Sequence, residues 1–180
     1  MASAFSHAIV ASALASVFPQ KVMTRRLWFA GVFCSVLPDI DSIGFFHGVP
    51  YDSFWGHRGF THSLFFALVL SALLTYALFV KKPELMFVSF LYLFLSAASH
   101  GVFDAITNGG LGVAFFSPFN TTRYFLPFRP VVVSPISIRR FFSGRGLAVL
   151  ASEFRWIWLP SIAFASLVTC IRKLGFNRAG

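Results

Sequence analysis

Charged residues are scarce in this chain, and acidic residues are the scarcest among them. Asp and Glu together number 6 and Lys and Arg 15, so that charged residues make up 12% of the 180 residues, about half the share found in soluble domains. With 57% hydrophobic residues, the chain has too little polar surface to be soluble. This excludes the usual interpretation of a net charge of +9, which is nucleic-acid binding. We therefore expect an integral membrane protein whose basic excess serves topology and contact with anionic lipid headgroups.

Cysteine and N-terminal charge are also nearly absent. Cys34 and Cys170 lie in separate apolar segments, which is typical of inert buried thiols and excludes a disulfide-rich scaffold. No Lys or Arg precedes Lys21, so the first apolar stretch lacks the basic region of a cleavable signal peptide. We expect that stretch to remain in the protein as a helix.

Five apolar segments predict the helices of a membrane domain. They cover residues 2–18, 27–37, 61–80, 84–104 and 156–171. Residues 111–152 contain five arginines and no Asp or Glu among many Phe, Pro and Val residues. The sequence therefore predicts one domain over 1–180: an all-α integral membrane protein with about five transmembrane helices and a long aromatic, Arg-rich loop before the last helix.

Basic clusters at three helix ends predict the topology. Under the positive-inside rule these clusters lie in the cytoplasm, which puts the N-terminus outside and the C-terminus inside. The arginines of 111–152 would then lie outside, which is tolerated because long loops translocate largely regardless of charge. The predicted location is the bacterial inner membrane. The clusters are Lys21, Arg25 and Arg26; Lys81 and Lys82; and Arg172 and Lys173.

This topology places a set of imidazoles and carboxylates at the outer membrane interface. Mixed ligands of this kind suit Zn²⁺, Mn²⁺ or Fe, and seven are enough for two divalent ions with bridging carboxylates. We expect two ions, with zinc favoured. The candidate ligands are His7, Asp39, Asp41, His57, His62, His100 and Asp104.

Spacing supports convergence of some of these side chains. His100 and Asp104 are four residues apart and therefore share a helical face. Asp39 and Asp41 follow a proline, and an extended backbone there would aim both carboxylates the same way. The alternative is that a single histidine is an ordinary buried residue and that His100 and Asp104 are a simple hydrogen-bonded pair. Taken together, the residues favour metal, because ionisable groups within a membrane are unfavourable and usually functional.

Each of the remaining polar residues has a functional and an ordinary structural interpretation. Arg58 is predicted to hold a substrate phosphate with its planar fork, or else to be an interfacial arginine. Arg123 and Arg129 in the Arg-rich loop are expected to bind a lipid headgroup, or to make non-specific lipid contact. Glu153 is a candidate ligand or general base, or the ordinary acid at a helix N-terminus. His47 lies in a Gly- and Pro-rich connection and is expected to be a bystander.

Several motifs resemble the YdjM-like family of membrane-bound metal-dependent hydrolases. The resemblance implies a multi-helix inner-membrane hydrolase, in a family of which some members are under LexA control. The motifs are His7, Pro38-Asp39-Ile40-Asp41, His57-Arg58-Gly59-x-Thr61-His62-Ser63, His100-x-x-x-Asp104-Ala105-x-Thr107-Asn108, Pro118-Phe119, Arg123-Tyr124 and Glu153.

These observations favour a hydrolase that cleaves a phosphoester of a lipid or lipid-linked substrate. A dinuclear site lowers the pKa of a bound water and clamps a phosphoryl oxygen, which is the chemistry that such hydrolysis requires. The alternative is a non-enzymatic metal- or proton-handling protein of transporter type. Transporters usually carry internal repeats and charges near mid-membrane, whereas this chain shows no repeat and places its charges at one face.

Overall fold

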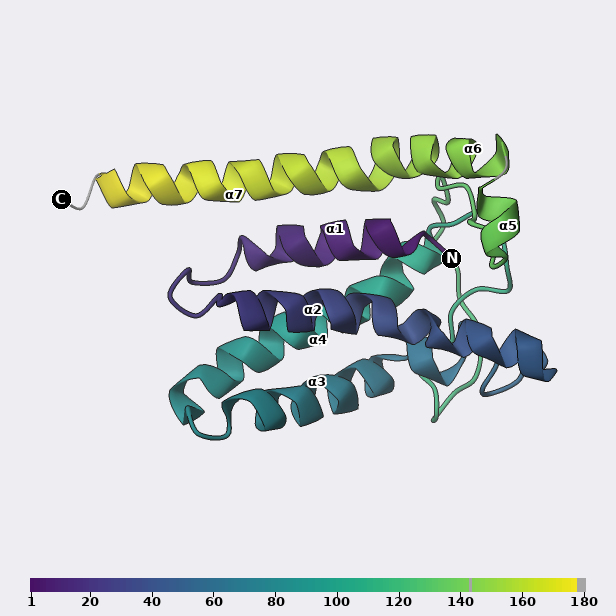
Figure 1. Ribbon diagram of the computed structural model, residues 1–180, viewed down its shortest axis with the longest axis horizontal. Helices are drawn as coiled ribbons and strands as arrows, with labels where there is room; N and C mark the ends of the chain where they lie inside the picture. Colours follow the sequence, from purple (N-terminus) through teal and green to yellow (C-terminus); the bar gives the residue numbers. More distant parts are fainter. Residues whose placement is uncertain (143, 178–180) are drawn as a thin grey trace.

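The computed structural model describes residues 1–142 and 144–177 (Figure 1). Within these ranges it is all-helical and contains no strand, only two isolated bridges. The elements are α1 (Ala4–Ala15), α2 (Arg25–Val36), the 3₁₀ helix η1 (Leu37–His47), the 3₁₀ turn η2 (Phe60–His62), α3 (Leu64–Phe79), α4 (Pro83–Ala105), α5 (Ile138–Phe141), α6 (Gly144–Glu153), the π-helical turn η3 (Phe154–Trp158) and α7 (Leu159–Asn177). Each of the five apolar segments forms a helix, as predicted.

Helix α4 is the centre of the bundle. It packs against α1, α2 and α3, which run antiparallel to their neighbours in the chain (Figure 1). Tyr92 and Leu93 of α4 are fully buried in the apolar core, together with Leu27 and Cys34 of α2. The approach of α2 to α4 is close because Gly31 leaves room for the Tyr92 ring.

Three helices are long and apolar enough to cross a membrane: Arg25–His47, Pro83–Ala105 and Gly144–Leu174. Helices α1 and α3 are apolar but shorter. The 12 residues of α1 extend about 18 Å, less than a hydrocarbon core of about 30 Å. The membrane-protein assignment therefore rests on three helices, and the number of five spans stays a prediction.

The second predicted helix is longer than its apolar segment. We expected a loop after Leu37, but α2 continues directly into η1, which ends at His47 and is capped by Gly48 in the left-handed conformation (φ 75°). Pro38 lies at the start of η1, where its missing N–H has no partner to lose. The backbone at Asp39 and Asp41 is therefore 3₁₀-helical and not extended, which corrects the sequence-based expectation.

The last helix begins earlier than predicted. The Arg-rich loop was expected to continue to Ser152, yet α6 begins at Gly144 and runs through η3 into α7. No proline interrupts the chain until Pro160. A proline ring clashes with the carbonyl four residues earlier, here Trp156, which lies in the π-helical turn. The wider turn accommodates Pro160, so a continuous helix replaces a loop and a shorter helix.

The three basic clusters lie at one end of the bundle. The loops that carry Lys21 and Lys81, and the C-terminal part of α7, gather at the end opposite η1 and α5 (Figure 1). Arg172 of α7 donates hydrogen bonds to the carbonyl oxygens of Val17 and Phe18, which joins α7 to the first of these loops. The Arg-rich segment 111–152 lies at the other end of the bundle (Figure 1), so the orientation stays a prediction.

A reporter fusion tests the orientation. A reporter fused after Lys173 should read as cytoplasmic, and one inserted at Gly144, at the opposite end, should read as external, because basic residues at helix ends are retained in the cytoplasm. Enzymatic reporters active on only one side of the membrane provide the measurement. The reverse pattern would overturn the orientation and leave the fold intact.

The contact between α2 and α4 gives a prediction about stability. A Cβ atom at Gly31 would lie 2.3 Å from the Tyr92 ring, so Gly31→Ala should destabilise the protein by roughly 1–3 kcal/mol through overpacking. Thermal unfolding in detergent measures the effect. Gly144→Ala is the control, since nothing lies within 4 Å of a Cβ there. Equal melting temperatures for the two variants would contradict this account of the crossing.

Candidate metal centre

Six of the seven predicted ligands converge at the end of the bundle opposite the basic clusters. They form two groups, and within each group the candidate ligand atoms all lie within 4.8 Å of one another. Asp39 belongs to both groups. The first group is Asp39, His57, His62 and Asp104, and the second is His7, Asp39 and His100.

The local sequence around His57 explains how the loop reaches the bundle. Arg58 has a φ of 64°, a strained conformation for a residue with a side chain. Its N–H donates to Asp41 Oδ2 and its carbonyl oxygen accepts from the N–H of Ala114, which holds the strained residue in place. At Gly59 a Cβ atom would lie 2.3 Å from the Phe54 carbonyl oxygen, so this turn requires glycine.

Two histidines point their Nε2 atoms at each other. His100 donates its Nδ1 proton to the carbonyl oxygen of Ser35 at 2.7 Å, which leaves a lone pair on its Nε2. That atom lies 3.0 Å from Nε2 of His62. Two lone pairs at this distance repel each other, so a proton or a metal ion must lie between the imidazoles.

The surroundings of His62 suit either a proton or a metal ion at its Nε2. Its Nδ1 lies 3.1 Å from Asp41 Oδ2 and its Nε2 lies 3.6 Å from Asp39 Oδ1. Burial by itself lowers the pKa of His62, but contacts with Asp104, Asp39 and Asp41 raise that pKa well above its usual range. A proton on His62 therefore stabilises the metal-free cluster. Metal binding would displace that proton.

His57 has one nitrogen fixed and one without a partner. Its Nδ1 donates to Asp41 Oδ1 at 2.6 Å, while its Nε2 is buried and has no hydrogen-bond partner among the described residues. Burial lowers the pKa of His57 and the bond to Asp41 opposes that shift. A neutral imidazole with a carboxylate behind Nδ1 and a free Nε2 is the usual arrangement of a metal-bound histidine.

His7 and Asp39 complete the set. His7 is fully buried and stacks on His100 with ring centroids 3.7 Å apart. Within the described part of the chain, neither nitrogen of His7 and neither carboxylate oxygen of Asp39 has a hydrogen-bond partner. Buried polar atoms without partners are strongly unfavourable, so these groups are candidate ligands of an ion.

The distances fit a metal ion. Ligand atoms 2.0–2.1 Å from a tetrahedral ion lie about 3.4 Å from one another. Nε2 of His100 lies 3.4 Å from Asp39 Oδ1. Nε2 of His62 lies 3.6 Å from both Asp104 Oδ2 and Asp39 Oδ1. The donor set, the unpartnered atoms and their separations are all consistent with divalent metal.

Asp41 has a different position from the other six residues. Its two oxygens accept from His57 Nδ1, the Arg58 N–H and the Thr61 hydroxyl, and it lies behind the imidazoles. We expected it to share a direction with Asp39, but the 3₁₀ backbone turns the two carboxylates apart. Asp41 is therefore placed to orient His57 and His62.

All three guanidinium nitrogens of Arg58 donate hydrogen bonds within the protein. Arg58 is fully buried, and its Nε donates to Asp104 Oδ2 at 3.0 Å. Its Nη1 and Nη2 donate to the Gly109 carbonyl oxygen and the Thr107 hydroxyl, each at 2.8 Å. These contacts occupy the guanidinium donors that we expected to hold substrate. The geometry therefore favours a role for Arg58 in orienting Asp104.

The two arginines predicted to bind a headgroup differ in their surroundings. Arg123 donates to the carbonyl oxygens of His57, Tyr51 and Ser53, which fixes the loop that carries the cluster. Arg129 is exposed and lies over the Phe125 ring at 4.6 Å. Neither arginine lines the cavity beside the cluster.

Glu153 belongs to neither metal group. It is fully buried at the end of α6, and its two oxygens accept hydrogen bonds from the N–H and the hydroxyl of Ser3, each at 2.5 Å. It therefore ties the last helix to the segment before α1. Trp158 reinforces this contact by donating to the Ser6 hydroxyl at 2.8 Å.

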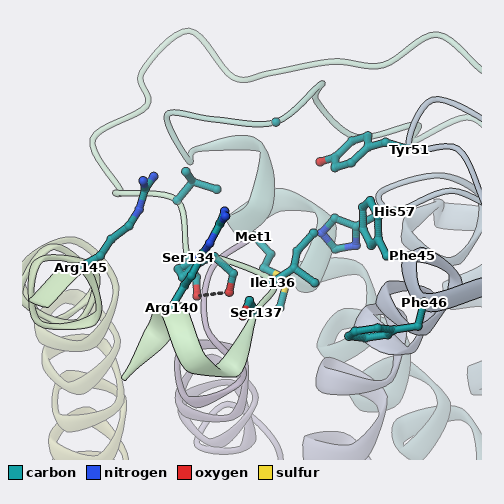
Figure 2. A pocket seen from close by; sticks show the side chains of 13 residues that line it. Met1, Phe45, Phe46, Tyr51, His57, Ser134, Ile136, Ser137, Arg140 and Arg145 are labelled. Carbon is teal, nitrogen blue, oxygen red and sulfur yellow. Dashed lines mark hydrogen bonds between the residues drawn. The ribbon is translucent and has the colours of Figure 1, made fainter. Parts of the chain in front are cut away.

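A cavity of about 450 Å³ adjoins the cluster (Figure 2). His57 belongs both to the cluster and to the cavity wall. Tyr51, Arg140 and Arg145 also line the cavity, and the sequence reasoning did not single them out. Nothing in the sequence distinguishes these two arginines from the others of the Arg-rich segment, because their position depends on where α5 and α6 fold.

Comparison with known proteins gives two matches. A family model described as YdjM inner membrane protein matches residues 1–176. The chain is also 34% identical over 176 residues to inner membrane protein YbcI of Escherichia coli strain K12. The aligned region covers 96% of this chain and 100% of that protein. No solved structure matches the chain.

The buried position of Arg58 gives a prediction about stability. Arg58→Lys keeps the charge beside Asp104 but loses the donors to Gly109 and Thr107, so it should lower the unfolding free energy by about 2–4 kcal/mol. Thermal unfolding in detergent measures the loss. Arg129→Lys, at an exposed site, should leave the melting temperature unchanged. A silent Arg58→Lys would show that these bonds do not support the fold.

Proposed function

The chain belongs to the YdjM inner membrane protein family, as its motifs predicted, and from this membership and the buried His/Asp cluster we propose that it is a membrane-embedded, metal-dependent hydrolase. Its substrate is a phosphoester of a lipid or lipid-linked molecule. The observation that carries the proposal is the convergence of unpartnered, buried ligand atoms on His7, Asp39 and His57.

Two ions fit the two overlapping groups. Asp39 lies in both groups and is the residue that would bridge them. His57, His62 and Asp104 would hold one ion, and His7 and His100 the other. Mixed imidazole and carboxylate donors favour Zn²⁺, with Mn²⁺ or Fe as alternatives. When bound, the ions supply Lewis-acid activation of water and of a phosphoryl oxygen.

The surrounding residues hold these ligand side chains in the orientation that metal binding requires. Asp41 holds the Nδ1 proton of His57 and faces Nδ1 of His62, so that both Nε2 atoms would present lone pairs to the ions once the extra proton on His62 is displaced. The Ser35 carbonyl oxygen does the same for His100. Arg58 orients Asp104 through its hydrogen bond to Oδ2. Such preorganisation removes the reorganisation that metal binding would otherwise require.

The position of the cluster supports a lipid substrate. Phe46, Phe119 and Phe142 are at least 80% exposed, and they lie on η1, on the connection between α4 and α5, and after α5. These segments gather at the cluster end of the bundle (Figure 1). Exposed apolar rings at one end of a bundle are typical of a surface that contacts lipid. A lipid at that level presents its phosphate to the cluster while its tails stay in hydrocarbon.

One observation favours the alternative of a proton- or metal-handling protein. Ser89 and Ser96 share the α4 face with His100, and their buried hydroxyls, with those of Ser71 and Thr75 on α3, have no hydrogen-bond partner in the described ranges. A row of hydroxyls below a histidine cluster can conduct protons if water enters. The cluster at one end of the bundle, however, differs from the mid-membrane sites of transporters.

Metal content tests the proposal directly. The purified protein should hold about two ions per chain, and Asp39→Asn or His62→Ala should lower that number because each removes a converging ligand. Asp41→Asn should retain metal with an affinity about 10–100-fold weaker, as expected for a group behind the ligands. Elemental analysis after titration with Zn²⁺ gives the stoichiometry, and release of phosphate or a phosphoalcohol from lipids gives the activity.

The control is His47→Ala. His47 is exposed at the end of η1, and its Nδ1 bonds only to the Ile43 carbonyl oxygen, so both metal content and activity should match the wild type. Metal that binds without lipid cleavage, together with proton or metal flux in proteoliposomes, would replace the hydrolase with the alternative. A protein that binds no metal at all would exclude the hydrolase and a metal-handling role, and would leave proton handling as the alternative.

A further inference from the structure

The cavity beside the cluster has two walls of different character. Arg140 and Arg145 approach it from α5 and α6, and Tyr51, Phe45 and His57 form the facing side (Figure 2). Its volume of about 450 Å³ is within the range of sites for small molecules. It is therefore large enough for a headgroup.

The charge of the lining selects an anion. Arg140 and Arg145 contribute two cations, and none of the described lining residues is Asp or Glu. An ammonium group in the cavity would find no carboxylate among these lining residues, whereas a phosphate would find the planar guanidinium of Arg145. The lining therefore discriminates against zwitterionic headgroups that carry an ammonium.

His57 places this anion next to the cluster. The imidazole is buried, it lines the cavity, and its Nε2 has no partner within residues 1–142 and 144–177. A phosphate held by Arg145 therefore lies in a cavity that shares a wall with the metal ligands. The cavity and the candidate metal centre therefore meet at His57.

An apolar ridge leads to the rim of the cavity. Ile40, Ile43 and Phe46 are spaced by three residues in η1, and a 3₁₀ helix has three residues per turn, so they share one face. They are 53%, 51% and 80% exposed, and Phe46 also lines the cavity. An acyl or prenyl chain can follow this ridge while its headgroup enters the cavity.

We propose that this cavity binds the headgroup of a membrane amphiphile that carries a phosphate and no ammonium group, with Arg145 as a phosphate-binding residue and the η1 ridge as the path of its tail. The inference rests on the proposed function only in treating this amphiphile as the substrate. The binding itself requires neither metal nor turnover.

Native mass spectrometry of the full chain in detergent provides the test. The probes are a diacyl phosphatidate, a phosphatidylglycerol and a phosphatidylcholine with the same chains, and glycerol 3-phosphate as a headgroup without tails. The two anionic lipids should bind at least tenfold more tightly than phosphatidylcholine. Arg145→Ala should weaken the anionic lipids about tenfold, the effect of one charged hydrogen bond, and Arg145→Lys should recover part of the loss.

Arg129→Ala is the matched control, because Arg129 is an exposed arginine of the same segment that does not line the cavity. It should bind all three lipids like the wild type. Equal losses in Arg129→Ala and Arg145→Ala would show general attraction to headgroups and overturn the proposal. Glycerol 3-phosphate that binds as tightly as phosphatidate would overturn the role of the tail.

Failure of this inference can be told apart from failure of the proposed function. Selective binding of anionic lipids that is lost in Arg145→Ala supports the cavity assignment even if the protein holds no metal and cleaves nothing. Two metals per chain with cleavage of lipids, but without any headgroup preference, overturn the cavity assignment alone. Metal content of Arg145→Ala should equal that of the wild type, since Arg145 belongs to neither metal group.

Discussion

The burial of Asp104 is the constraint on which the rest of the cluster depends. This carboxylate lies in α4 with no exposed surface, and an ionised group there is stable only with charge and hydrogen bonds around it. The Arg58 guanidinium and the Ala2 N–H supply them. To reach Asp104, Arg58 adopts a strained backbone conformation, and the same loop delivers His57 and His62 to the cluster.

The 3₁₀ helix η1 gives different orientations to two carboxylates that are only two residues apart in the sequence. Because successive residues turn by about 120° in a 3₁₀ helix, Asp39 and Asp41 face different sides of His62. Asp39 meets its Nε2 side and keeps both oxygens unpartnered within the described chain, while Asp41 meets its Nδ1 side. Asp39 is therefore a candidate ligand and Asp41 an orienting group. The outer face of the same helix carries the exposed apolar ridge.

Much of this arrangement was predictable. The apolar segments predicted the helices, and the cost of intramembrane charge indicated that His7, His100 and Asp104 belong together; the structure brings them together. The roles of the arginines were not predictable in the same way. Arg58 was expected to face substrate and is instead buried against Asp104, whereas Arg145, one of five arginines in an acid-free segment, lines the cavity. Sequence separation carries no information about which acceptors a long side chain can reach.

Composition and hydrophobic pattern were sufficient for the membrane class, the helices and the set of groups that must share a site, because these follow from the transfer of apolar and charged groups between water and lipid. The tertiary structure alone decided which atoms are partnered and which are not. Asp41 and His57 illustrate the reason: a hydrogen bond depends on distances of a few tenths of an ångström between segments 16 residues apart in the chain, and only the packing of η1 against the loop before α3 sets them.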